Sequence, residues 1–324
     1  MDCSKSATWR QESWRPASGP VSWAWVTVSW AWVTASWAAV CWLAVLLSLL
    51  GTSLTAAEPK RLTTDGRRKF SPVFIDETEL VYVDFVKPVL FQIQQMTLAD
   101  GRVEALHSDA KAPEMEPAFS ADGRYCAFVQ TRGALSLALV IRDRRKNQDA
   151  AIPPAPGFAG YRSPTFSPDG KRVVYSFAEE GKQSLFSVDI QAQNRRRLTD
   201  HVGIDNWPMF SPDGKQILFG STRDGNFEIY TMDADGKHVK QLTHSPFQDL
   251  RPRYSPDGRR IVFTSNRDGN FEIYTMHTDG SHLRRITNHP ERDDYATWHP
   301  AGDSIVLVSE RSGRHDLYHL PIGK

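Results

Sequence analysis

The stretch Phe210-Ser211-Pro212-Asp213-Gly214 and the later stretch Arg223-Asp224-Gly225-Asn226-Phe227-Glu228-Ile229-Tyr230 each occur more than once in this chain. The first recurs from Phe166 and from Tyr254, with weaker copies from Phe119, from Trp298 and over 72–76; the second recurs from Arg267. The aromatic positions from Phe166 to Trp298 are 44 residues apart, and the two earlier intervals are 47 and 45 residues. Six units of this length predict a repeat architecture.

Each unit has the pattern of four strands separated by turns. In the fourth unit the strands are expected at 208–210, 216–219, 227–232 and 239–243. The Pro-Asp-Gly segment favours a turn because Pro presets φ and Gly tolerates a positive φ, and the third strand alternates apolar and polar residues. We therefore predict an all-β, six-bladed propeller of four-stranded antiparallel blades that start near residues 70, 115, 162, 206, 250 and 294.

The last unit ends after its third strand. The segment Lys60-Arg61-Leu62-Thr63 matches the fourth-strand pattern Arg196-Arg197-Leu198-Thr199. We therefore expect the strand at 60–63 to complete the last blade, which would leave no long unpaired sheet edge.

These motifs resemble the WD40-like (PD40) repeats of TolB-type propellers, over essentially 61–324. The resemblance implies a six-bladed propeller whose partner is another cell-envelope protein or a peptidoglycan-linked one. TolB also carries an α/β domain before its propeller, whereas 57 largely apolar residues occupy that place here. The resemblance is specific to the repeat type and not to one function.

The first 57 residues form a separate apolar segment, followed by the propeller at 58–324. From Pro16 to Ala57 there is no charged residue or histidine, and 38–50 has the length of a signal-peptide core. The stretch 21–50 is also long enough to span a bilayer. A cleaved signal peptide, an uncleaved anchor and a start codon assigned too early all stay open. The first two predict an exported, periplasmic or otherwise extracytoplasmic protein.

Composition excludes some classes of function. The formal net charge is +1, which gives no basic face for nucleic acid. The propeller has one cysteine, Cys126, in an apolar run typical of a buried side chain. No Gly-x-Ser-x-Gly or His-Glu-x-x-His motif occurs. We expect a monomer with no cofactor and no metal site.

One repeated position of the units is a candidate binding site. Five residues before each first-strand aromatic stand Lys69, Glu114, Tyr161, Asp205, Asp249 and Asp293. We expect them in the loops that enter the innermost strands, around one mouth of the central channel. The loops between the second and third strands should bring arginines to the same face. The candidate binding residues are Glu114, Asp205, Trp207, Asp249, Arg251, Asp293, Asp294, Tyr295, Arg223, Arg267 and Arg311.

These side chains have two interpretations. The acids can cap backbone N–H groups of a repeated turn and pair with the repeated arginines. Alternatively they form a polar funnel for a cationic peptide, a sugar or a cation. On the second interpretation, replacing Asp205, Asp249 and Asp293 with Ala would weaken partner capture without unfolding the ring.

Two functions follow from these interpretations. The first is an exported, non-catalytic binding protein that engages a protein or peptide at the channel mouth. The alternative is a carbohydrate-active, oligosaccharide-lyase-like enzyme with a site in the channel, because some pectate-fragment lyases resemble TolB in their propeller. The enzyme would need a cluster of His, Asp or Arg, and His201, His244 and His289 follow the fourth strands. A scaffold that binds along its blade edges is a third possibility.

Overall fold

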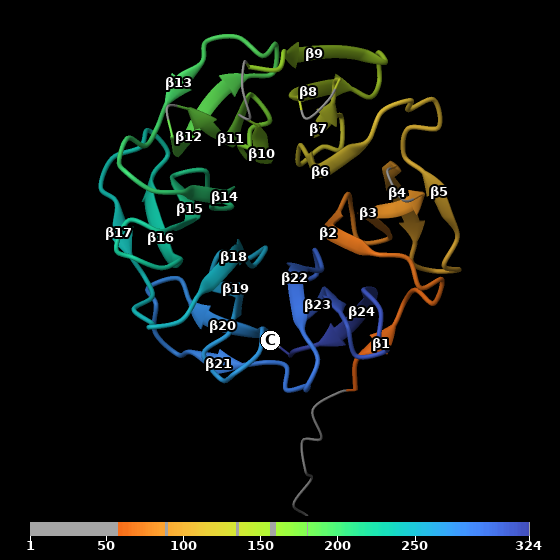
Figure 1. Cartoon of the computed structure of the whole chain (residues 1–324), viewed down its shortest axis with the longest axis vertical. Helices are drawn as coiled ribbons and strands as arrows, with labels where there is room; N and C mark the ends of the chain where they lie inside the picture. Colours follow the sequence, from red (N-terminus) through yellow and green to blue (C-terminus); the bar gives the residue numbers. More distant parts are fainter. Residues whose placement is uncertain (1–57, 88–89, 134–135, 156–159, 180, 324) are drawn as a thin grey trace, which may run out of the picture. The chain divides into compact units, whose positions relative to one another are not determined.

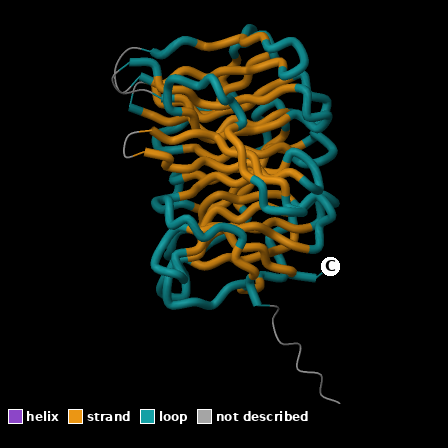
Figure 2. The backbone as a smooth tube through the Cα atoms, turned by 90° about the vertical axis from the view of Figure 1, so that its right-hand side faces the viewer, coloured by secondary structure: helices purple, strands orange, loops and turns teal. Residues whose placement is uncertain are grey.

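The propeller predicted from the repeats is present. The computed structural model describes residues 58–323 except 88–89, 134–135, 156–159 and 180. Six four-stranded antiparallel sheets surround a central axis, with the first strand of each sheet innermost (Figure 1). Loops gather at the two faces and strands occupy the middle (Figure 2). The predicted signal or anchor segment lies outside the described residues, and no helix in the described part is long and apolar enough to cross a membrane.

The strands have the following bounds. Blades 1 and 2 consist of β2 (Lys69–Phe74), β3 (Glu79–Lys87), β4 (Leu90–Thr97), β5 (Val103–Ala105), β6 (Glu114–Phe119), β7 (Tyr125–Thr131), β8 (Leu137–Asp143) and β9 (Gln148–Ile152). Blades 3 and 4 consist of β10 (Tyr161–Phe166), β11 (Arg172–Glu179), β12 (Lys182–Asp189), β13 (Arg196–Arg197), β14 (Asp205–Phe210), β15 (Gln216–Ser221), β16 (Glu228–Asp233) and β17 (Lys240–Gln241). Blades 5 and 6 consist of β18 (Asp249–Tyr254), β19 (Arg260–Ser265), β20 (Glu272–His277), β21 (Arg284–Arg285), β22 (Asp293–Trp298), β23 (Ser304–Ser309), β24 (Asp316–Pro321) and β1 (Lys60–Arg61).

The repeated turn is held by its own side chains. In blade 4, Ser211 Oγ donates to Asp213 Oδ1 at 2.6 Å and accepts from the backbone N–H of Gln216 at 3.0 Å. Gly214 has a φ of 72°, which glycine adopts without strain. The core lies between neighbouring blades, where Val174 and Leu185 of blade 3 pack against the apolar strands of blade 4.

Cys126 is fully buried, as expected from the apolar run that contains it. Burial raises the pKa of its thiol to about 12. A thiol in this state is a small apolar side chain and not a nucleophile.

The ring closes as predicted. Strand β1 pairs antiparallel with β24 at the outer edge of blade 6, with Lys60 opposite His319. Thr63 Oγ1 donates to Asp316 Oδ1 at 2.8 Å and accepts from Leu317 N at 3.0 Å. Thr243 has the same pair of contacts in blade 4, with Glu228 and Ile229 N.

The first strands begin earlier than the sequence analysis expected. Asp205 is the first residue of β14 and lies opposite Ser221, so it belongs to the sheet and not to the entry loop. The reason is a bulge: the pairing of β14 with β15 shifts register between Asn206 and Met209. All six first strands carry such a shift. A bulge lets a strand continue past a residue that does not fit the ladder.

Candidate functional site

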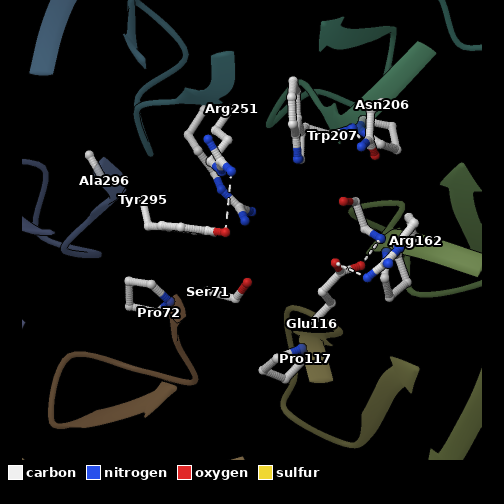
Figure 3. A pocket seen from close by; sticks show the side chains of 14 residues that line it. Ser71, Pro72, Glu116, Pro117, Arg162, Asn206, Trp207, Arg251, Tyr295 and Ala296 are labelled. Carbon is white, nitrogen blue, oxygen red and sulfur yellow. Dashed lines mark hydrogen bonds and ion pairs between the residues drawn. The ribbon is translucent and has the colours of Figure 1, made fainter. Parts of the chain in front are cut away.

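The bulges direct one residue from each blade toward the axis. The third residue of every first strand has a φ between 48° and 54°, in the left-handed region. These residues form what we call the inner ring: Ser71, Glu116, Ser163, Trp207, Arg251 and Tyr295. They line one cavity of about 330 Å³, the axial cavity, seen from close by in Figure 3. Bulges often re-aim a side chain in this way at functional sites.

One wall of the axial cavity is a stack of three side chains. The Arg251 guanidinium carbon lies 4.1 Å from the ring centroid of Tyr295 and 5.0 Å from that of Trp207 (Figure 3). Arg251 also donates to Asp294 Oδ1 and to the Tyr295 hydroxyl, both at 3.2 Å. A cation between two aromatic faces is stabilised by both rings, so this wall is pre-formed.

The Trp207 indole is also held by packing against blade 4. A Cβ on Gly220 would lie 2.9 Å from Trp207 Cε3, so the indole occupies the space that a side chain at 220 would need. Phe227 packs against the indole with ring centroids 5.0 Å apart.

The other wall carries charges of both signs. Glu116 accepts from the backbone N–H of Ser163 and from Arg162 Nη1, the latter at 3.3 Å (Figure 3). The Arg162 side chain is 44% exposed and is therefore partly open to solvent. Arg253, two residues after Arg251 on β18, also lines the axial cavity.

The repeated acids occupy a different environment from the one predicted for a binding funnel. Asp205, Asp249 and Asp293 are completely buried. Each contacts the arginine eighteen residues later: Arg223 at 3.3 Å, Arg267 at 2.7 Å and Arg311 at 2.6 Å. Burial raises the pKa of Asp293, against the opposing influence of Ser309 and Arg311. These contacts fit the interpretation of repeated, internally paired side chains.

The remaining predicted residues divide between the two environments. Glu114 is buried and contacts His107 Nδ1 at 2.6 Å. Asp294 is buried and accepts hydrogen bonds from Arg251 and Thr264. Of the eleven candidates, the axial cavity brings together Trp207, Arg251 and Tyr295.

Sequence reasoning missed the rest of the cavity lining. The overlooked charged residues are Glu116, Arg162 and Arg253. A signal in the sequence could have found the inner ring, because in five of the six blades its residue stands directly before the first-strand proline. These residues are Ser71, Glu116, Ser163, Trp207 and Arg251.

The histidines do not assemble into a metal centre. His201 Nε2 lies 2.8 Å from Asp205 Oδ1, and the His289 backbone N–H donates to Glu272. Within the described ranges, no group of three or more His, Cys, Asp or Glu side chains is placed to hold a metal ion.

Comparison with known proteins gives the following matches. The family model of the TolB beta propeller domain (PD40) matches residues 60–250 and 245–324. TolB from Acinetobacter baumannii is 22% identical with a TM-score of 0.62, over 76% of this chain and 65% of that chain. A protein described as TolB from Agrobacterium tumefaciens is 21% identical with a TM-score of 0.64, over 81% of this chain and 93% of that chain.

An enzyme has a similar fold. Oligogalacturonate lyase in complex with manganese is 13% identical with a TM-score of 0.57, over 84% of this chain and 95% of that chain. At these identities the solved structures show a shared fold alone. The chain spans about 65% of the length of the Acinetobacter protein.

Proposed function

Because this chain belongs to the TolB β-propeller family, we propose that it is a non-catalytic binding protein that holds part of a partner protein, or a peptide, in the axial cavity. The observation that carries the proposal is the stack of Arg251 between Trp207 and Tyr295. A wall already fixed in the free protein loses little conformational entropy when a ligand binds. Aromatic and arginine side chains in such positions are typical energetic centres of protein interfaces.

The proposal extends to the compartment and the partner. The apolar segment at 1–57 acts as a signal peptide or an anchor, so the propeller works outside the cytoplasm as a monomer. Its partner is then a protein or peptide of the cell envelope. Membrane association arises only through the N-terminal segment, if that segment stays uncleaved.

The test is an affinity selection of short random peptides on the full chain. We expect enriched peptides whose affinity falls about tenfold or more in Trp207→Ala or Tyr295→Ala, equivalent to ~1.4 kcal/mol of binding free energy. The matched control is Phe247→Ala, which removes a 44% exposed aromatic side chain that does not line the axial cavity. If Phe247→Ala loses the peptides and Trp207→Ala keeps them, the binding site is elsewhere.

The alternative, a carbohydrate-active propeller enzyme, draws support from the arginines of the cavity. Acidic sugars carry carboxylates, which guanidinium groups bind well. The full chain would be incubated with galacturonate oligomers, with and without added Mn²⁺, and the products separated by size. Shortened, unsaturated oligomers that disappear in Arg251→Gln would replace the binding proposal by an enzyme. Intact oligomers under both conditions would leave the binding function in place.

A further inference from the structure

Arg253 is the charged side chain of the axial cavity that the fold itself does not explain. No hydrogen bond or ion pair links its guanidinium to any residue in the described part of the chain. Burial lowers the pKa of this guanidinium; the Glu116 carboxylate opposes the shift and Arg251 adds to it. A partly buried cation that makes no direct hydrogen bond or ion pair is poorly compensated within the fold, which leaves it free to pair with an anionic group of a ligand.

The net charge of the cavity lining also favours an anionic ligand group. Three guanidinium groups, those of Arg162, Arg251 and Arg253, line it against the single carboxylate of Glu116. Arg251 is engaged by Asp294, Tyr295 and the two aromatic faces, and Glu116 is engaged by Arg162 and Ser163. The excess positive charge is therefore available at Arg253 and at the exposed part of Arg162.

We propose that the axial cavity recognises a carboxylate group of the bound peptide, with Arg253 as its principal ion-pair partner and Arg162 as a weaker one. The carboxylate belongs to an acidic side chain or to the peptide's C-terminus. This inference rests on the proposed binding function. A cavity of about 330 Å³ lies at the lower end of the size of ligand sites, which fits one side chain or one chain end better than an oligosaccharide.

The experiment compares four probes on the full chain by calorimetry. The first is a pool of short peptides without Asp or Glu that have free C-termini, and the second is the same pool amidated. The third is an amidated pool that contains Asp and Glu, and the fourth is galacturonate oligomers. We expect the first or third pool to bind at least tenfold more tightly than the second, and the affinity to fall with added salt. The pool that binds identifies the source of the carboxylate.

The arginine variants localise the contact. Arg253→Gln should weaken the binding pool about tenfold or more, and Arg162→Gln should weaken it less because that side chain is more exposed. The matched control is Arg284→Gln, which removes one exposed guanidinium from the outermost strand of blade 5. Equal binding of the amidated acid-free pool, or unchanged affinity in Arg253→Gln, would overturn the carboxylate site. Binding of the galacturonate oligomers and of none of the peptide pools would refute the proposal that the ligand is a peptide.

Stability supplies a second readout. Because the Arg253 guanidinium makes no direct hydrogen bond or ion pair with the described residues, Arg253→Gln should melt at the same temperature as the unaltered chain or at a higher one. A clear fall in melting temperature would assign Arg253 a structural role and count against the proposal. Loss of peptide binding in Trp207→Ala, with Arg253→Gln still binding normally, would refute the carboxylate and keep the proposed function.

Discussion

The hydroxyl group of Thr63 supports ring closure beside the pairing of β1 with β24. The Thr63→Val substitution keeps the shape of the side chain and removes two hydrogen bonds, one to Asp316 Oδ1 and one from Leu317 N. Asp316 is completely buried, and Lys69 Nζ, 3.8 Å from Oδ1, is too far for a hydrogen bond. Each unsatisfied buried group costs about 1–3 kcal/mol, so the loss of two should lower the free energy of unfolding by about 2–6 kcal/mol.

Equilibrium unfolding in urea measures this loss. Thr243→Val removes the equivalent hydroxyl inside blade 4 and should cost a similar amount, because its two contacts are the same in kind. Thr278→Val is the control, since the Thr278 hydroxyl has no hydrogen bond to the residues that the structure describes. If Thr63→Val changed stability by less than about 0.5 kcal/mol, as a surface substitution does, the hydrogen bonds of Thr63 would not secure the ring closure in solution.

Three further predictions concern buried charges and a close backbone contact. Asp249→Ala leaves the charge of Arg267 without its partner and should lower the free energy of unfolding by about 3 kcal/mol, measured in urea. A variant that stayed equally stable but no longer bound peptide would favour the interpretation of the acids as a binding funnel. Burial raises the pKa of Asp84. The stability contributed by its protonated carboxyl is therefore fully present below the ordinary pKa of 3.8 and is lost as pH rises through the raised pKa. Thermal melts of Asp84→Asn should therefore gain stability over the unaltered chain as pH rises, and a constant difference would contradict this. Gly280→Ala places a Cβ 2.7 Å from the Leu242 carbonyl oxygen at a φ of 92°, which should lower the free energy of unfolding by about 1–3 kcal/mol. The control Gly313→Ala has nothing within 4 Å of its Cβ and should lower it less. Equal melting temperatures of the two variants would refute the steric argument.

The sequence predicted the fold because propeller blades are specified locally. The Ser-Pro-Asp-Gly turn contains its own hydrogen bonds, as between Ser211 and Asp213, so each copy reports the same structure wherever it occurs. Closure was predictable for the same reason, since Thr63 repeats the chemistry of Thr243. The start of each first strand was not, because a bulge depends on pairing with the neighbouring strand.

The candidate site was only partly predictable because repetition and function have opposite signatures here. Asp205, Asp249 and Asp293 recur because blades 4, 5 and 6 share the same internal Asp–Arg pair. The inner ring differs from blade to blade, with Glu116 in one and Trp207 in another, so a search for repeated residues passes over it. Only the radial arrangement of the sheets brings these unlike side chains into one cavity.

The central claim is that the axial cavity is where the partner binds. The most direct measurement is a crystal structure of the full chain with a peptide enriched in the affinity selection. The account predicts peptide density in the axial cavity, against Trp207 and Tyr295, with a carboxylate within hydrogen-bond distance of Arg253. Peptide density on the blade edges or outer loops, with the cavity unchanged, would contradict it.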